Sequence, residues 1–347
     1  MRYLTQPPHS ETLEVLNIQQ QEDLADLQQQ ISDGILSSSP QLPSLLLWND
    51  EGIALFDRFS QSPPYYLNKK ELEILAHQGD DISSYNVIVG FKRRVLNQIR
   101  SLHKTSLILS ACERQQRPVL YYALDVSIGE LTESLTSLMK RMGPTQFVKV
   151  RGLLGTYDDC VAWLASDPKM VIQSSVTFLW MGNSIANLQP DDASLLLSRF
   201  SHICTKQGVR CQFIVAADAC THKTTIMAAY DTTKRPLHDF LLNGLRHANT
   251  VMGHNVFQTS DWTCAVEFND RANVLNTYYI PRRDLQLDIN GIAVEFRKGD
   301  QVLAITSGKW TEKDFHAVSV NAGLHIADTW RDMSRIYCKN VPNPASR

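Results

Sequence analysis

The stretch that decides the fold runs from Val119 to Leu154 and reads VLYYALDVSIGELTESLTSLMKRMGPTQFVKVRGLL. Two short apolar runs, 119–124 and 148–154, flank a segment, 128–140, in which apolar residues recur at helical spacing. Short apolar runs bounded by turn residues are typical of buried strands, and strands that alternate with helices are typical of a parallel sheet. The stretch therefore predicts one strand–helix–strand unit.

The same alternation extends to both sides of this unit. We expect further short strands at 87–89, 176–180 and 212–217, and further helices at 101–114 and 191–204. Five apolar strands separated by helices predict an α/β fold with a doubly wound, Rossmann-like sheet.

The alternation then stops. A helix is expected at 238–252, and alternating residues between 263 and 295 indicate antiparallel strands. After a further strand at 302–306, Thr311 and Asp314 have the spacing of a capping box, which predicts the start of a helix. An α+β insertion therefore interrupts the α/β domain before its last strands.

Composition excludes several classes of function. The chain has 347 residues, 43% hydrophobic content and a formal net charge of −2, so no basic surface favours nucleic acid or an anionic membrane as partner. No apolar run approaches the roughly 20 residues that span a bilayer, and the N-terminus lacks a signal-peptide core. The seven cysteines form no CxxC pair and the histidines no HExxH motif, so we expect free thiols, no metal and a cytoplasmic protein.

Candidate site residues follow the predicted strands, because ligands of open α/β sheets bind at the carboxyl ends of the strands. Asp125 ends the second strand, where a carboxylate suits the two ribose hydroxyls of a nucleoside; a helix cap or turn is the alternative role. Residues 155–159 follow the third strand and suit an adenine ring. Residues 182–187 follow the fourth strand and combine small residues with two amide side chains.

The turn after the first strand departs from what a nucleoside cofactor needs. A glycine-rich turn is expected there, because only glycine lets the backbone approach the cofactor closely. The sequence reads Val-Gly-Phe-Lys-Arg-Arg over 89–94, with one glycine, one aromatic residue and three cations.

Taken in order, the motifs resemble those of a known family. That family is the histidine-specific methyltransferases that use S-adenosyl-L-methionine (SAM), including the ergothioneine-pathway histidine methyltransferases and the fungal dimethylallyltryptophan N-methyltransferases. The similarity begins at Leu42, and the stretches that carry it are LPSLLLWNDEGIALFD (42–57), PPYYLNKKELEIL (63–75), YYALDVS (121–127), GTYDDCVAWL (155–164), WMGNSIANL (180–188), AAYDT (228–232), FLLNGLRHANTVMG (240–253) and SGKW (307–310).

The resemblance implies a Rossmann-like class I methyltransferase sheet with an inserted α+β substrate lobe. It assigns residues 67–218 and 304–347 to the methyltransferase domain, and residues 1–66 and 219–303 to the lobe. It further implies SAM as cofactor, an aromatic amine or amino-acid-like small molecule as substrate, and a place in fungal secondary metabolism of the alkaloid type. Oligomeric state is left open.

Residue by residue, the resemblance supplies two sets of candidates. Asp125 matches the ribose acid, Thr156 and Tyr157 the adenine contacts, and the full cofactor set is Gly90, Lys104, Asp125, Thr156, Tyr157 and Gly182. The substrate set is Trp48, Tyr66, Asn187, Tyr230 and Ser307, of which Asn187, Tyr66 and Tyr230 are the catalytic candidates. Packing roles for Trp48 and Tyr66, and a helix-capping role for Asn187, are the alternatives.

Two departures from the family pattern bear on function. The Glu-Leu-Gly-Ser-Gly turn of the family is absent from residues 89–94, where a sulfonium cofactor would meet bulk and positive charge. The family's Glu-x-Ser-x-Lys reads Ile305-Thr306-Ser307-Gly308-Lys309, so the glutamate that binds imidazole in the histidine enzymes is replaced by Ile305. This change argues against histidine as substrate and favours a more apolar ring such as an indole.

Two functions therefore stay open. The first is a SAM-dependent N-methyltransferase that acts on the amino group of an aromatic amino acid or a derived metabolite. The second is a SAM-independent relative that binds, cyclises or isomerises a small aromatic metabolite in the same pocket. The missing glycine turn has a third explanation: an error in assigning the exons of the gene, over residues 90–103, would also remove it.

Overall fold

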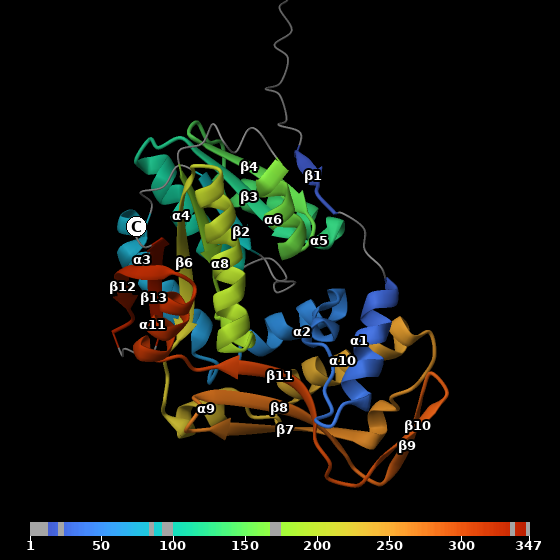
Figure 1. The fold of residues 1–347 in the computed structure, drawn as a ribbon. Helices are drawn as coiled ribbons and strands as arrows, with labels where there is room; N and C mark the ends of the chain where they lie inside the picture. Colours follow the sequence, from blue (N-terminus) through green and yellow to red (C-terminus); the bar gives the residue numbers. More distant parts are fainter. Residues whose placement is uncertain are drawn as a thin grey trace, which may run out of the picture.

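An eight-stranded sheet forms the frame of the molecule in this computed structural model (Figure 1). The structure describes residues 13–19, 24–82, 87–91, 100–166, 175–333 and 337–344. The order of the strands is β1-β4-β3-β2-β5-β6-β13-β12, with β1 to β6 parallel and β13 antiparallel to both of its neighbours. The bounds are β1 (Val15–Asn17), β2 (Val87–Phe91), β3 (Val119–Asp125), β4 (Val148–Leu154), β5 (Ser175–Trp180), β6 (Arg210–Asp218), β12 (Leu324–Arg331) and β13 (Tyr337–Pro344).

The five strands predicted from the sequence are confirmed as β2 to β6, and so is the α/β fold. From β2 the chain moves through β3 and β4 toward one edge, and then returns to β5 and β6 on the other side. The direction of winding therefore reverses between β2 and β5. In doubly wound sheets a crevice opens at this reversal, at the carboxyl ends of the strands.

Helices cover both faces of the sheet. Helix α4 (Arg100–Arg114) contacts α3 (Leu67–Ile82) and α5 (Ile128–Met142), and α8 (Pro190–Lys206) contacts α6 (Tyr157–Ser166) and α11 (Glu312–Asn321). Side chains of successive strand residues point to opposite faces. Tyr121 accordingly packs in the core with α4 and α5, whereas its neighbour Tyr122 packs in the core with α6 and α8.

Helix α6 begins where the sequence suggested only an adenine-binding loop. Its start is fixed by a reciprocal cap: the Thr156 N–H and hydroxyl donate to Asp159 Oδ2, and the Asp159 N–H donates to Thr156 Oγ1 at 3.2 Å. Thr-x-x-Asp is a variant of the capping box, so the signal was present in the sequence. The box predicted at Thr311 and Asp314 is confirmed at the start of α11.

A second layer lies below the large sheet in Figure 1. Its three-stranded sheet has the order β11-β8-β7, and β9 pairs with β10 as a hairpin. The elements are α1 (Leu24–Leu36), η1 (Ser44–Trp48), α2 (Asp50–Ser60), α9 (Lys223–Ala229), α10 (Arg235–Met252), β7 (Trp262–Asn269), β8 (Val274–Pro281), β9 (Leu285–Ile289), β10 (Ile292–Phe296) and β11 (Val302–Gly308). The antiparallel insertion predicted from the sequence is therefore present.

The expected change of domain at residue 304 falls inside β11, which pairs with β8 of the small sheet. At the other end of the chain β1 pairs with β4 of the large sheet, although residues 1–66 were assigned to the lobe. The division into two domains stays a prediction.

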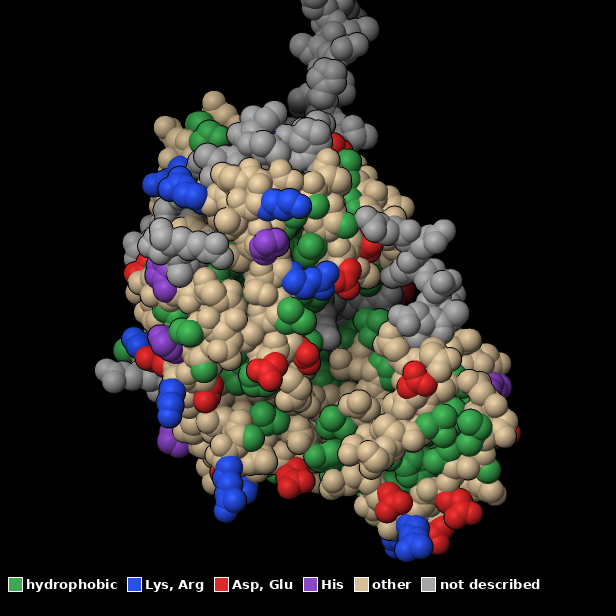
Figure 2. Space-filling view, in the orientation of Figure 1, with side chains coloured by type: hydrophobic (Ala, Val, Ile, Leu, Met, Phe, Trp, Pro, Cys, Tyr) green, Lys and Arg blue, Asp and Glu red, His purple; other side chains and the backbone are tan. Residues whose placement is uncertain are grey.

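On the face drawn in Figure 2, basic and acidic side chains are interspersed, and the described residues form no continuous basic patch of the kind that binds nucleic acid. Among the described helices, none combines the length and the hydropathy needed to cross a bilayer.

The start of α2 depends on one side chain. Asn49 Oδ1 accepts hydrogen bonds from the Gly52 N–H at 2.9 Å and from Asn243 Nδ2 at 2.6 Å. Asn243 is fully buried on α10, so the same oxygen caps α2 and joins it to α10.

We expect Asn49→Ala to lower the free energy of unfolding by about 1–3 kcal/mol, because the helix cap is lost and a buried amide loses its acceptor. Chemical denaturation measures this change. The matched control is Asn49→Asp, which keeps an acceptor for both donors and should cost clearly less. Equal stability of the Ala variant and the unmodified protein would contradict the assignment.

Candidate functional site

A cavity opens where the carboxyl ends of β2 and β5 face the second layer. The large sheet contributes Gly90 from β2, Leu179 from β5 and Gly182 just after β5. These residues flank the point at which the winding of the sheet reverses. The space open to the centres of water molecules is about 110 Å³, which is room for several waters or one ring-sized group.

Aromatic side chains from the second layer form one wall of this cavity. The rings of Trp48 and Phe56 lie 5.1 Å apart, those of Trp48 and Phe240 lie 5.0 Å apart, and those of Phe56 and Phe240 lie 5.3 Å apart. Spacings and tilts of this kind are favourable for aromatic pairs. Apolar side chains complete the wall, namely Phe59, Tyr65, Leu67, Leu237, Leu241 and Ile305.

A buried ion pair lies at the sheet end of the cavity. Lys104 Nζ is 2.7 Å from Glu71 Oε2 and 2.8 Å from Asn68 Oδ1, and the side chains of Lys104 and Glu71 are at most 2% exposed. Glu71 also accepts the N–H of Gly182 at 3.1 and 3.2 Å. Gly182 has φ +73°, a conformation that favours glycine, so the pair fixes the turn after β5. Lys104 itself lines the cavity.

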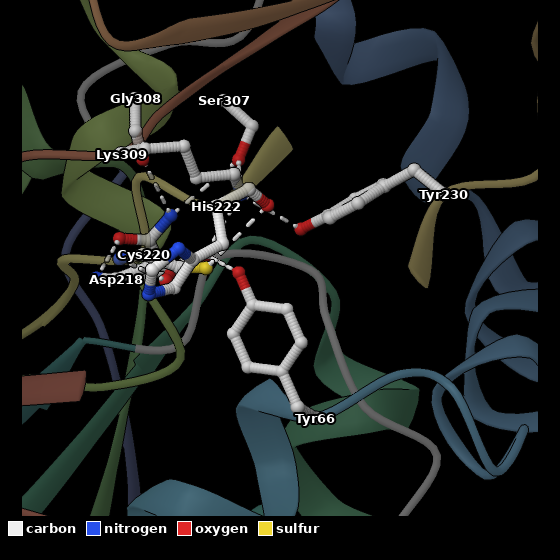
Figure 3. Close-up of polar contacts among 9 residues, drawn as sticks. Tyr66, Asp218, Cys220, His222, Tyr230, Ser307, Gly308 and Lys309 are labelled. Atoms are coloured by element: carbon white, nitrogen blue, oxygen red, sulfur yellow. Dashed lines mark hydrogen bonds and ion pairs between the residues drawn. The ribbon is translucent and has the colours of Figure 1, made fainter. Parts of the chain in front are cut away.

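A second buried ion pair joins the two sheets (Figure 3). Lys309 Nζ lies 2.9 Å from Asp218 Oδ2, and both side chains are fully buried. Lys309 also donates to Ser307 Oγ at 3.1 Å and to Tyr230 Oη at 3.2 Å, and its Nζ stands 4.5 Å from the centre of the Tyr230 ring. The Tyr66 hydroxyl donates to Asp218 Oδ2 at 2.7 Å. The pair thus links the end of β6 with the end of β11.

Asn183 extends this network to the turn after β5. Its Oδ1 accepts the N–H of Asp218 at 2.8 Å, and its Nδ2 donates to the carbonyl of Gly308 at 3.2 Å. Asn183 has φ +61°, which asparagine tolerates better than most residues. The turn, β6 and β11 are therefore held together by side-chain hydrogen bonds.

The pKa values of Tyr66 and Lys309 are set mainly by burial and by the carboxylate of Asp218. Burial, and after it the charge and hydrogen bond of Asp218, raise the pKa of Tyr66 far above its usual value, so this tyrosine stays protonated. Burial alone would lower the pKa of Lys309, but Asp218 and Tyr230 outweigh burial and the pKa is raised. Lys309 is therefore an ammonium.

Four of the five predicted substrate residues line the cavity: Trp48, Asn187, Tyr230 and Ser307. Asn187 is the last residue of η2 (Ser184–Asn187), and its side chain makes no hydrogen bond within the described part of the chain. Tyr66 differs, since it is not among the lining residues and its hydroxyl is directed at Asp218 (Figure 3). Its neighbour Tyr65 lines the cavity instead.

The predicted cofactor residues fall into two groups. Gly90, Lys104 and Gly182 line the cavity. The others are outside its lining at the carboxyl ends of β3 and β4, namely Asp125, Thr156 and Tyr157. The site roles of all these residues stay predictions.

Asp125, Thr156 and Tyr157 each make a local contact within the protein. Asp125 is 4% exposed and its Oδ1 accepts the N–H of Ser127 at 2.9 Å, which is the turn role named as an alternative. Thr156 caps α6. The ring of Tyr157 lies 5.3 Å from that of Trp180.

Gly90 has a structural reason to be glycine. A Cβ at this position would collide with the ring and hydroxyl of Tyr121, which is 1% exposed on the neighbouring strand. The single glycine of the unusual turn is thus required by packing alone. Residues 92–99 lie outside the described residues. They include the three cations of the unusual turn and most of the 90–103 segment for which an exon error was considered.

Sequence reasoning missed Asp218 and two members of the aromatic wall, Phe56 and Phe240, whereas Trp48 and the amide of Asn183 were already among the candidates. Asp218 closes an apolar strand just as Asp125 does, so the same signal was available for it. Lys309 lay inside a quoted motif without a role. Phe56 and Phe240 gave no signal, because aromatic residues on an amphipathic helix are more often core than pocket.

Metal chemistry has no ligand cluster to support it in the part of the chain that the structure describes, where no three His, Cys, Asp or Glu side chains gather suitably. Six cysteines are buried free thiols there, namely Cys112, Cys160, Cys204, Cys211, Cys220 and Cys264. Burial raises the pKa of Cys112 to about 11 and that of Cys264 to about 12, so both are protonated at neutral pH.

Comparison with known proteins identifies fungal N-methyltransferases among the relatives of this chain. The N-methyltransferase benX of Aspergillus terreus is 45% identical over 335 residues, which cover 95% of this chain and 92% of that protein. The N-methyltransferase dtpB of Aspergillus flavus is 39% identical over the same shares of the two chains. The 4-dimethylallyltryptophan N-methyltransferase easF of Trichophyton verrucosum is 29% identical over 95% of this chain and 98% of its own length.

Solved structures are more distant. The magnesium protoporphyrin IX methyltransferase ChlM of Synechocystis has 11% identity and a TM-score of 0.40, over 85% of this chain and 94% of that one. This similarity is too low to support a conclusion about the chain.

The sequence model of one protein family, described as "Histidine-specific methyltransferase, SAM-dependent", matches residues 27–341, almost the whole chain. With relatives above 30% identity over 95% of its length, the chain belongs to the family of histidine-specific, SAM-dependent methyltransferases.

Proposed function

We propose that this protein is a SAM-dependent N-methyltransferase that acts on the amino group of an aromatic amino acid or of a metabolite derived from one. One observation carries the proposal: a single cavity joins the crevice of the large sheet, at Gly90 and Gly182, to the aromatic wall around Trp48 and Phe240. A cofactor in the crevice and an aromatic substrate on the wall would therefore meet at this cavity. Relatives named as fungal N-methyltransferases support the same reaction.

The described residues fit the cofactor of the family. Asp125 offers a carboxylate at the end of β3, and Tyr157 offers a ring at the end of the neighbouring strand. Lys104 and the backbone of Gly182 lie where the crevice meets the cavity. When bound, SAM supplies an electrophilic methyl group on a sulfonium.

The chain's own residues then act by position. An amine attacks the methyl group only as a neutral, well-aligned nucleophile, so orientation is the main contribution of the protein. The wall of Trp48, Phe56 and Phe240 would hold the ring, and Asn187 would orient the amine with its side-chain amide. A water in the pocket would accept the proton that the amine releases, because Tyr65 and Tyr66 hold their own protons.

Cofactor binding tests the first half of the proposal. Calorimetric titration with SAM and with its demethylated product should give micromolar dissociation constants. Asp125→Ala should weaken both by at least about tenfold, because two hydrogen bonds to a charged acceptor are lost. Glu133→Ala removes an exposed carboxylate on α5, outside every segment assigned to the cofactor, and is the matched control. Absence of detectable heat with the unmodified protein would instead support the SAM-independent relative.

Substrate class is tested at Ile305, which lines the cavity where the histidine enzymes of the family have glutamate. An apolar residue there favours an apolar ring, so the protein should bind L-tryptophan more tightly than L-histidine. We expect Ile305→Glu to raise the ratio of histidine to tryptophan affinity by at least about tenfold. Ile305→Leu is the control and should leave the ratio unchanged. A preference for histidine in the unmodified protein would refute the aromatic assignment.

A further inference from the structure

The ammonium group of Lys309 is saturated by protein acceptors. An ammonium has three N–H donors and no acceptor. Lys309 Nζ lies 2.9 Å from Asp218 Oδ2, 3.1 Å from Ser307 Oγ and 3.2 Å from Tyr230 Oη, and its side chain is fully buried. Each N–H therefore has its own acceptor, and none is left for a ligand (Figure 3).

This saturation constrains the two hydroxyl groups. A hydroxyl has one hydrogen, and an oxygen that accepts from Lys309 cannot direct that hydrogen back at the ammonium. Ser307 Oγ also faces a second donor, Asn183 Nδ2, at 3.4 Å.

Among the residues that the structure describes, the hydrogens of Tyr230 and Ser307 have no protein acceptor of their own. Within the described residues, the structure contains no hydrogen bond that either hydroxyl donates. Both side chains line the cavity. The remaining direction for the two O–H bonds is into the cavity, where they present two donors on one side.

The arrangement is held rigidly. Asp218 accepts not only from Lys309 but also from the Tyr66 hydroxyl at 2.7 Å and, through Oδ1, from the Cys220 N–H at 3.1 Å. An ammonium without a partner would lose its proton on burial, but one that is paired with a carboxylate and fully hydrogen-bonded keeps its charge. Donors fixed before the ligand arrives bind it with less loss of entropy.

We propose that Lys309 is a positioning residue of the substrate pocket: by donating to Tyr230 and Ser307, it makes both hydroxyls donate to an acceptor atom of the substrate. The inference rests on the proposed function, because it assigns the acceptor atom to the molecule that is methylated. A purely structural latch between β6 and β11 is the competing explanation, since the same ion pair joins the two sheets.

The test removes both charges at once, so that no unpaired charge is left buried. The double variant Lys309→Met/Asp218→Asn is compared with the unmodified protein by calorimetric titration. Three matched pairs of probes share ring and amine and differ in a carboxylate acceptor: L-tryptophan and tryptamine, L-tyrosine and tyramine, L-phenylalanine and phenethylamine. Thermal unfolding and SAM titration are measured on the same samples.

We expect the unmodified protein to bind the acid of its best pair at least about tenfold more tightly than the amine. In the double variant this preference should fall to within about twofold, because the hydroxyls are free to rotate. The SAM affinity should stay unchanged.

The matched control is Lys70→Met/Asp332→Asn. It removes another lysine–aspartate pair, 3.0 Å apart with the aspartate fully buried, from residues that do not line the cavity. It should keep the preference of the unmodified protein.

Three results would overturn the inference. They are an unchanged acid preference in the double variant, an equal loss of preference in the control, and no binding of any acid by the unmodified protein. Failure of the proposed function is separate, because it would appear as absent SAM binding in the unmodified protein.

Discussion

The ion pair between Lys309 and Asp218 is the interaction on which the candidate site depends. Asp218 ends β6, the last of the six parallel strands of the large sheet, and Lys309 directly follows β11, the edge strand of the small one. Because both groups are fully buried, neither can be left without the other: removal of one partner from such a pair typically costs about 3–5 kcal/mol. The contact therefore holds the end of β11 against the end of β6.

A second buried ion pair, between Lys104 and Glu71, stabilises the sheet end of the cavity. It fixes the turn after β5 through the N–H of Gly182, and that turn also contains Asn183, which binds the backbone of Asp218. The two pairs are thus joined through one short turn at the point where the winding of the sheet reverses. Charged groups that are costly to bury are concentrated where a ligand would bind, which is typical of functional sites.

The sequence was sufficient for the large sheet and insufficient for the cavity. Strands β2 to β6 were predictable because each is a short apolar run closed by a turn residue or an acid. Helix α6 was predictable in principle from Thr156 and Asp159, but the stretch was interpreted only as a binding loop. The contact between Asp218 and Lys309 was not predictable, since it joins strands of two different sheets that are far apart in the sequence.

The same limit applies to individual site residues. Tyr65 and Tyr66 are adjacent and chemically identical, and only the structure distinguishes the one that lines the cavity from the one that binds Asp218. Gly90 was attributed to the cofactor, whereas the ring of Tyr121 already requires it. A pattern of residue types identifies the region of a site, but the direction of each side chain follows from packing.

Methyl transfer itself is the most direct test of the central claim. The purified protein is incubated with SAM and a panel of aromatic amino acids and indole derivatives, and products are analysed by mass spectrometry with fragmentation. We expect a product heavier by one methyl group, with the methyl on the amino nitrogen, and we expect its formation to be lost in Asp125→Ala. Binding of SAM without any methylated product, or a methyl group found on carbon or oxygen, would contradict it.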